Sequence, residues 1–374
     1  MTTMPKTSRA AVLTAHNAPI EVHDLPVPQT LEKGAMLVRI VAATICGSDV
    51  HLWDGSLAGS QAIDLPVIPG HEMIGSIVAR GEGTELDSFG TPLADGDRVL
   101  FTHAVCGHCF YCRTPNMSTL CTNRKAYMMS NCSRPPYLVG GFSEYVYVFP
   151  ESGRIRVPDS VDTAVASACS CALRTVMHSF ERLGKLEPWQ TVVVQGAGPL
   201  GLFATAVARD AGAQRVITIG APDDRLAIVR TLGADETISV QEHPAPEDRV
   251  NRVLELTDGQ GADVIFEFSG ARTAFDEGIR MSRYGARYVV TGQIDKPGQE
   301  TTVRPGVITR RQLSILGTWS GDITHCWQAL KFVEKTQHTF DFSQLITNRY
   351  GLDEVTKALT RMRNLEEIKP VIVP

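Results

Sequence analysis

Four cysteines lie close together in the first half of the chain, at a spacing that is suited to binding a metal ion. Cys106, Cys109 and Cys112 follow one another at intervals of three residues, and Cys121 comes shortly after them. Four thiolates complete the tetrahedron that zinc prefers and leave no position open for a substrate. The cluster therefore predicts a structural zinc site, with free core cysteines as the alternative. His108 lies inside the cluster but is not needed as a ligand.

A second possible metal site combines residues that are far apart in the sequence. Cys46 lies in Cys-Gly-Ser-Asp-Val-His, and Gly-His-Glu contains His71 and Glu72. A thiolate and an imidazole are good zinc ligands, but a tetrahedral site needs more donors. Cys171 is a candidate for the second sulfur, and Cys169 competes with it. Each residue alone is a weak signal, since a lone cysteine is usually a small buried side chain.

A third pattern, Gly-x-Gly-x-x-Gly, follows three consecutive valines and opens an apolar, alanine-rich segment. Gly196 permits a tight turn, Gly198 lets the backbone approach a pyrophosphate, and Gly201 lets a helix lie close to the strand. Pro199 and Leu200 begin the predicted helix, whose free N–H groups attract phosphates. The strand, turn and helix together predict binding of a dinucleotide.

The residues that would contact the adenosine ribose leave the choice between NAD and NADP open. An acidic residue usually ends the second strand of an NAD-binding fold, but that position is Gly220 here. The absence of an acidic side chain at this position removes a repulsion against the 2′-phosphate of NADP. The nearby Asp223 and Asp224 would disfavour a phosphate, or simply begin the next helix. Arg225 is compatible with either cofactor.

The elements that must position these residues change in character along the chain. The 374 residues suggest about two domains. The first half has short β-branched runs broken by Gly and Pro, which predicts a β-rich domain. Alternating strands and helices after about residue 158 predict a doubly wound parallel α/β sheet. The predicted elements are helix 163–182, strand 191–195, helix 199–212, strand 215–219, helix 222–232, strand 263–268, helix 272–282, strands 287–291 and 313–316, helix 352–362 and strand 371–373.

Composition excludes several classes of function. The formal net charge is −5 and no basic stripe appears, which argues against a nucleic-acid partner. No apolar run approaches the roughly 18 residues that a membrane span needs. The N-terminus lacks an apolar signal core, so a cytoplasmic protein is expected. Clustered cysteines in such a protein indicate metal binding rather than disulfides.

These motifs together resemble the zinc-dependent medium-chain dehydrogenases and reductases, the family of alcohol, sorbitol and threonine dehydrogenases, over nearly the whole chain. The resemblance implies a GroES-like catalytic domain from residues 1–160 and 317–374, with a zinc lobe at about 103–125. It places a Rossmann domain at 161–316. It further implies two zinc ions per chain, NAD or NADP, a small alcohol or carbonyl substrate, and a homodimer or homotetramer.

The resemblance assigns roles to individual residues. Cys46, His71 and Cys171 would bind the catalytic zinc, with Glu72 as an inner or outer carboxylate, and Cys106, Cys109, Cys112 and Cys121 the structural zinc. Ser48 and His51 would relay a proton. Two features depart from the family pattern. Eight residues rather than the usual seven separate Cys112 from Cys121. Polyol and threonine dehydrogenases tend to carry an acid at position 171. Cys171 is preferred to Cys169 because it lies seven residues before His178.

The family also suggests contacts to the rest of the cofactor. Backbone around Gly292, Gln293 and Ile294, and around Thr318 and Trp319, would meet the nicotinamide amide. Lys369 would lie near the pyrophosphate, with a solvated lysine as the alternative.

The expected activity is hydride transfer between an alcohol and NAD(P), with the alcohol polarised by zinc. A secondary alcohol or polyol is expected, and the reverse reaction reduces a ketone or aldehyde. Trp53 and Trp319 either line the substrate pocket or belong to the core. The alternatives are a reductase of activated C=C bonds on the same scaffold, and a non-catalytic cofactor-binding protein.

Overall fold

The computed structural model describes residues 4–59, 63–293 and 300–374. The chain divides into two compact units. Unit 1 contains Met1–Arg174, Ser320–Thr336 and Leu345–Pro374, and unit 2 contains Thr175–Trp319 and Gln337–Gln344. No helix within these described ranges combines the length and the apolar character that a membrane span requires.

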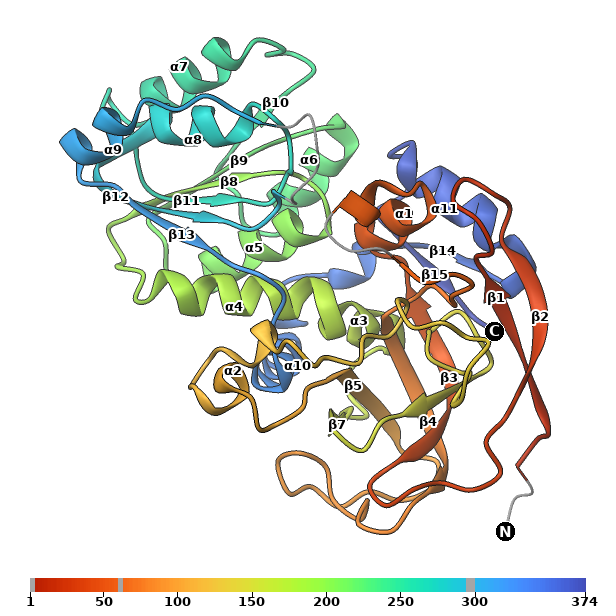
Figure 1. Cartoon of the computed structure of the whole chain (residues 1–374). Coiled ribbons are helices and arrows are strands. Elements are labelled where there is room, and N and C mark those ends of the chain that lie inside the picture. Colours follow the sequence, from red (N-terminus) through yellow and green to blue (C-terminus); the bar gives the residue numbers. More distant parts are fainter. Residues whose placement is uncertain (1–3, 60–62, 294–299) are drawn as a thin grey trace. The chain divides into compact units, whose positions relative to one another are not determined.

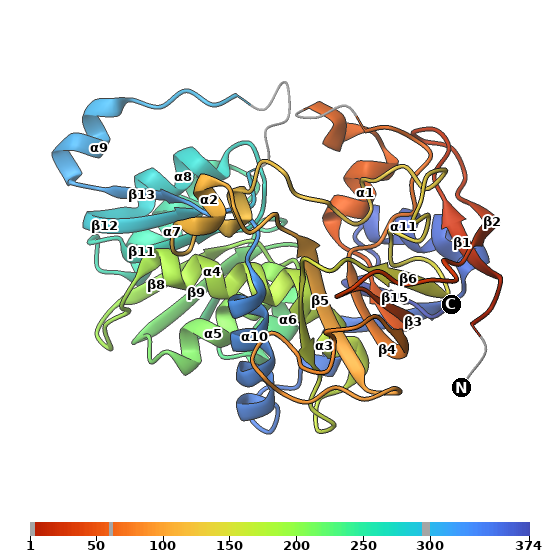
Figure 2. The ribbon, with the colours of Figure 1, turned by 60° about the horizontal axis from the view of Figure 1, so that its bottom comes forward.

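Unit 1 is built on β-strands, as the sequence predicts. Its strands are β1 (Thr7–Val12), β2 (Glu21–Pro26), β3 (Met36–Thr44), β4 (Glu72–Arg80), β5 (Arg98–Ala104), β6 (Tyr145–Val148), β7 (Ser152–Arg156), β14 (Ile346–Tyr350) and β15 (Lys369–Ile372). Strands β1 and β2 form an antiparallel pair. The remaining strands form one sheet in the order β14-β15-β3-β4-β5-β7, with β6 paired to β3. Figure 2 shows β3, β4 and β5 side by side.

Short helices connect and cover this sheet. They are α1 (Gly47–Trp53), α2 (Phe110–Arg113), α3 (Thr163–Ala168), α10 (Ile323–Thr336) and α11 (Val355–Arg363). Helix α3 packs on β3 and β4, which explains why seven of the nine residues of β3 are buried. The carboxylate of Asp162 begins α3 by accepting the backbone N–H groups of Ala164 and Val165, which otherwise lack partners at a helix N-terminus. Of these helices, α1, α2 and α10 were not predicted from the sequence.

The prediction of one continuous α-helix over residues 163–182 is wrong, because a π-helical turn interrupts it. Helix α3 is followed by a π-helical turn at Cys169–Leu173, and α4 (Arg174–Leu183) continues from there. A π turn inserts a residue into the helical repeat and so rotates the side chains relative to an unbroken helix. Cys169 is fully buried, whereas Cys171 within the same turn is partly exposed.

Unit 2 is the predicted doubly wound sheet. Its strands are β8 (Thr191–Gln195), β9 (Arg215–Gly220), β10 (Glu236–Ser239), β11 (Ala262–Glu267), β12 (Ser282–Val290) and β13 (Ser314–Gly317). They run parallel in the order β10-β9-β8-β11-β12-β13. This is the order of a dinucleotide-binding fold, with β8 as its first strand.

Helices lie on both faces of this sheet. Besides most of α4, they are α5 (Pro199–Asp210), α6 (Asp223–Thr231), α7 (Pro246–Leu256), α8 (Ala274–Met281) and α9 (Pro305–Arg311). Helix α5 lies on one face and α8 on the other (Figures 1 and 2). Burial on both faces explains the run of valines in β8, all of which are fully buried. Strand β10 and helices α7 and α9 were not predicted from the sequence.

Candidate metal centres and dinucleotide site

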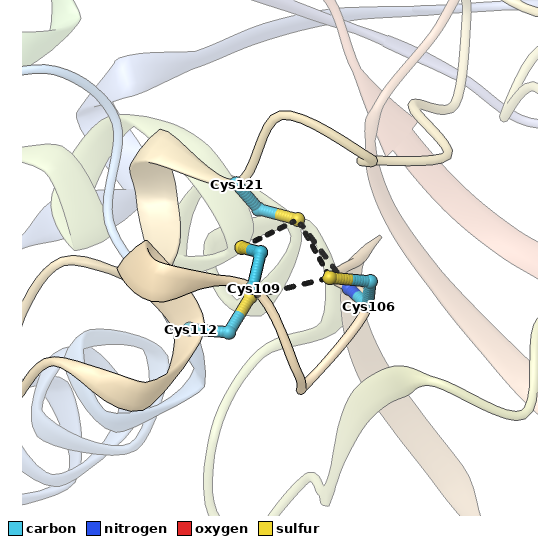
Figure 3. A group of neighbouring side chains, drawn as sticks. All are labelled: Cys106, Cys109, Cys112 and Cys121. Atoms are coloured by element: carbon cyan, nitrogen blue, oxygen red, sulfur yellow. Dashed lines mark hydrogen bonds between the residues drawn. The ribbon is translucent and has the colours of Figure 1, made fainter.

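The four clustered cysteines converge in unit 1 (Figure 3). The sulfurs of Cys106 and Cys121 lie 3.6 Å apart, and the pairs Cys109–Cys121 and Cys106–Cys112 lie 4.0 Å apart. A tetrahedral zinc with Zn–S bonds of about 2.3 Å requires sulfurs roughly 3.8 Å apart. The extra residue before Cys121 is therefore absorbed in the loop, and the donor set fits zinc.

Backbone groups prepare this cysteine cluster for a cation. The N–H of His108, which donates to the sulfur, lowers the pKa of Cys106 to about 5, so this thiol ionises readily. Burial raises the pKa of Cys112 to about 12. The ring Nδ1 of His108 lies 2.7 Å from the carbonyl oxygen of Cys106 and the side chain is exposed. The histidine thus braces the loop instead of completing the cluster.

The second predicted group also comes together in unit 1. The potential ligand atoms of Cys46, His71, Glu72 and Cys171 all lie within 4.8 Å of one another. Cys46 precedes the first residue of α1, His71 and Glu72 stand at the start of β4, and Cys171 lies in the π-helical turn. Among the described cysteines, Cys171 and not Cys169 joins this group.

The carboxylate of Glu72 shows that this group is suited to a cation. Oε2 of Glu72 accepts hydrogen bonds from the hydroxyl of Thr44, at 2.6 Å, and from the ammonium of Lys369. Its Oε1 is buried and has no hydrogen-bond partner among the described residues. A buried carboxylate oxygen without a hydrogen-bond partner destabilises the folded chain unless an ion or another group interacts with it. A cation held by two sulfurs and an imidazole would do so, and this donor set suits zinc.

Asp49 orients two of the ligands, a role that the sequence analysis missed. Its carboxylate accepts the backbone N–H groups of Cys46 at 2.8 Å and Gly70 at 2.9 Å. It also lies 3.4 Å from Nδ1 of His71. Burial alone would lower the pKa of His71, but the carboxylate outweighs it and raises the pKa to about 10. With Nδ1 turned to Asp49, Nε2 of His71 remains for the metal.

Neither the predicted place of Lys369 near the pyrophosphate nor the alternative of a solvated lysine is correct. The side chain is only 1% exposed, and its ammonium donates to Glu72 and, at 3.2 Å, to the carbonyl of Ile45. Burial raises the pKa of Glu72 to about 7, while Lys369 opposes that rise. Strand β15 pairs antiparallel with β3, and this pairing places the lysine next to Glu72 of the metal group. Sequence spacing offered no sign of that pairing.

The two proposed relay residues both stand on α1. Ser48 is partly buried, and its hydroxyl lies 3.8 Å from the sulfur of Cys46. His51 lies one helical turn further on, with Nδ1 2.9 Å from the hydroxyl of Ser56. Residues three apart share one face of a helix, so Ser48 and His51 lie on the same face of α1, with Ser48 next to the metal group.

A further histidine lies next to the metal group without any signal in the sequence. The rings of His103 and His71 stack with centroids 6.0 Å apart. The backbone N–H of Tyr127 donates to Nδ1 of His103 at 3.1 Å. Burial, with the positive charge of Arg124 adding to it, lowers the pKa of His103 well below its usual value. Since Nδ1 accepts this N–H group, the neutral form of the ring has its proton on Nε2.

The glycine motif in unit 2 has the geometry of a phosphate-binding turn. Gly196 has φ +121°, and its N–H donates to the carbonyl of Ile219 at 2.7 Å. A Cβ atom at Gly201 would lie 1.8 Å from the carbonyl oxygen of Gly196, so the helix can approach this closely only with glycine. At Gly198 a Cβ would meet nothing within 4 Å. Pro199 begins α5 at the expected position.

The residues predicted to meet the nicotinamide lie near the carboxyl ends of the neighbouring strands. The N–H of Gly292 donates to the carbonyl of Glu267 at 2.9 Å, and that of Thr318 to Val290 at 3.0 Å. The hydroxyl of Thr318 is buried and unpartnered among the described residues. Trp319 is 48% exposed. Ile294 lies outside the described residues.

Trp53 packs in the hydrophobic core of unit 1. It is 6% exposed, and its indole N–H donates to the carbonyl of Ala18 at 2.7 Å. This packing supports the core alternative for the tryptophan.

The fold and these two groups define a zinc metalloenzyme with a dinucleotide-binding sheet, and comparison with known proteins agrees. A model of the zinc-binding dehydrogenase family matches residues 199–335, and one of the alcohol dehydrogenase GroES-like domain matches residues 32–159. The 5-exo-hydroxycamphor dehydrogenase of Pseudomonas putida is 35% identical over 98% of both chains. An L-threonine 3-dehydrogenase of Bacillus subtilis is 30% identical over 94% of both chains. A crystal structure of an alcohol dehydrogenase from Thermotoga maritima matches with a TM-score of 0.90 and 32% identity, over 98% of this chain and 99% of that one.

The chain belongs to the zinc-dependent medium-chain dehydrogenase family. It is an oxidoreductase that acts on the CH–OH group of an alcohol, with NAD or NADP as cofactor. Its two metal groups fit one catalytic and one structural zinc ion. The alternative of a C=C reductase is not favoured by these relatives.

Proposed function

We propose that this chain interconverts a secondary alcohol and the corresponding ketone. The observation that carries the proposal is the buried group of Cys46, His71, Glu72 and Cys171 with its unpartnered carboxylate oxygen. The related 5-exo-hydroxycamphor and L-threonine 3-dehydrogenases are, by their names, enzymes of secondary alcohols. A polyol remains within this substrate class.

Each residue of unit 1 has a defined task in this proposal. Cys46, His71 and Cys171 hold the catalytic zinc with Glu72 beside it, and the four lobe cysteines hold the structural zinc. When bound, the catalytic zinc supplies a Lewis acid that lowers the pKa of an alcohol hydroxyl. Ser48 accepts the released proton, and His51 passes it to water, because an imidazole exchanges protons readily near neutral pH.

Unit 2 binds the cofactor, which accepts the hydride. The turn from Gly196 to Gly201, with Pro199 and Leu200 at the start of α5, binds the pyrophosphate. Gly292, Thr318 and Trp319 orient the nicotinamide. The hydride chemistry belongs to the cofactor, and these residues fix its position. An intact Ser48 and His51 pair also argues against a purely cofactor-binding role, which needs no proton transfer.

A panel of substrates tests the proposal. Secondary alcohols, including 5-exo-hydroxycamphor and L-threonine, polyols and ketones are assayed at 340 nm with NAD and NADP in parallel. Turnover of at least one secondary alcohol or ketone is expected. Activity confined to primary alcohols would contradict the substrate class, and silence of both cofactors with every substrate would support the binding-protein alternative.

The proposal includes a cytoplasmic homodimer or homotetramer. Light scattering coupled to size-exclusion chromatography measures the mass, and a monomeric mass near 40.7 kDa would contradict this part. Fractionation of the producing cell tests the location.

A further inference from the structure

The carboxyl end of β9 has no room for the acidic side chain that commonly binds the adenosine ribose. A Cβ atom at Gly220 would lie 2.4 Å from the Cβ of Ala197 and 2.8 Å from its backbone nitrogen. The turn that brings Ala197 there is held by the hydrogen bond from Gly196 to Ile219. Both contacts involve atoms close to the backbone, so neither can rotate away. Glycine at position 220 is therefore a consequence of how the phosphate-binding turn lies on β9.

A carboxylate nevertheless stands at this edge of the sheet. Asp223 is the first residue of α6 and is exposed. Its Oδ1 accepts the hydroxyl of Ser239 at 2.5 Å. Ser239 ends β10 and is the register partner of Gly220 on β9. The side chain of Asp223 is thus held beside the place where the missing acid would stand.

The start of α6 is poorly suited to a phosphate. Asp223 and Asp224 both lie in its first turn. The carboxylate of Asp224 accepts the N–H of Arg225 at 2.8 Å, so the helix already satisfies one of its free N–H groups internally. Arg225 itself is buried, with 5% of its surface exposed. A 2′-phosphate here would meet two negative charges.

We propose that Asp223 replaces the missing strand-end acid and gives this chain a preference for NAD over NADP. A carboxylate accepts hydrogen bonds from the two ribose hydroxyls, whereas it repels a 2′-phosphate. The inference rests on the proposed function, since it concerns the cofactor of that reaction. Ser239 acts as a positioning residue, because it holds the carboxylate without reaching the nucleotide through its own chemistry.

Binding of the reduced cofactors measures this preference without any turnover. NADH and NADPH are titrated into the full-length, zinc-loaded protein and followed by nicotinamide fluorescence. We expect NADH to bind at least about tenfold more tightly than NADPH. In Asp223→Asn we expect weaker NADH binding and a ratio within about threefold, because the negative charge is lost. Glu236→Gln is the matched control, since Glu236 starts β10 and so lies at the amino end of the strand that Ser239 ends. It should keep the wild-type ratio.

A second measurement on the unaltered protein does not depend on any variant. Adenosine 5′-monophosphate should displace bound NADH, and adenosine 2′,5′-bisphosphate should displace it at least about tenfold less well. Equal or tighter binding of NADPH would overturn the inference and leave the proposed function standing. So would a wild-type ratio in Asp223→Asn. If the unaltered protein binds neither dinucleotide, the proposed function itself fails and this inference with it.

Discussion

The two cysteine-containing metal groups of unit 1 differ in how they are assembled. The four lobe cysteines lie on one short segment, offer identical donors and are only partly buried, apart from Cys121. The group around Cys46 draws its members from α1, β4 and the π-helical turn. It mixes sulfur, nitrogen and oxygen donors, and buried polar residues surround it. A local loop is enough to hold an ion, whereas a reactive ion needs an environment that only distant segments can build.

The replacement Cys46→Ser should have the largest effect. We expect turnover to fall by at least about a thousandfold, because loss of the Lewis acid removes several kcal/mol of stabilisation from the transition state. The zinc content should drop from about two ions per chain to about one. Steady-state kinetics and metal analysis measure these quantities. Cys169→Ala, at a cysteine outside both groups, should retain both ions. A fully active Cys46→Ser protein would refute the catalytic role of this group.

The replacement Cys112→Ser should act on stability instead. Removing one thiolate from a structural site weakens the metal and the fold that it supports. We expect one zinc ion to be lost and the melting temperature to fall by roughly 5 °C or more. The turnover number of the protein that remains folded should stay within about twofold of the original. Calorimetry and kinetics at low temperature separate the two effects. A loss of turnover as large as that of Cys46→Ser would erase the distinction between the groups.

Replacing Lys369 tests the surroundings of the reactive group. Lys369→Met leaves the carboxylate of Glu72 buried beside Thr44 without its positive partner. We expect activity or zinc affinity at this group to fall by about 10- to 100-fold, while the lobe zinc is retained. Lys369→Arg keeps the positive charge and should lose less activity and zinc affinity than Lys369→Met. Unchanged activity in Lys369→Met would show that this ion pair serves packing alone.

The smallest effect is expected for His108→Ala. The ring Nδ1 lies 2.7 Å from the carbonyl oxygen of Cys106, and the side chain is exposed. Zinc content should stay at two ions per chain, and stability should change by no more than about 0.5 kcal/mol. Loss of the lobe zinc in this variant would mean that the histidine is a ligand and that the four-sulfur interpretation is incomplete.

Local patterns in the sequence predicted much of the fold and of both metal groups. The lobe cysteines and the glycine turn are each contiguous, so spacing alone reveals them. The alternation of strands and helices after residue 158 predicted the parallel sheet of unit 2. The π-helical turn was not predicted, because residues 163–182 have the composition of an ordinary helix and tertiary contacts decide how its turns are wound.

Three residues show what could not be read from local patterns, because their surroundings depend on distant contacts. Lys369 was placed near the pyrophosphate by resemblance, yet the antiparallel pairing of β15 with β3 buries it against Glu72. For Trp53 the sequence left two alternatives open, a pocket or the core, and its hydrogen bond to the carbonyl of Ala18 supports the core. Asp49 appeared only as a member of the Cys-Gly-Ser-Asp-Val-His motif, because its role requires Gly70 and His71 to be near it.

The amino-acid sequence by itself determined the chemistry that the chain can perform: sulfur and imidazole donors at zinc spacing, and a glycine turn between a strand and a helix. Tertiary structure alone decided which charge lies beside the reactive group and that position 220 must be glycine. The reason is physical. Donor type and local spacing are properties of neighbouring residues, whereas burial, ion pairing and close backbone approach arise only when segments far apart in the chain are brought together.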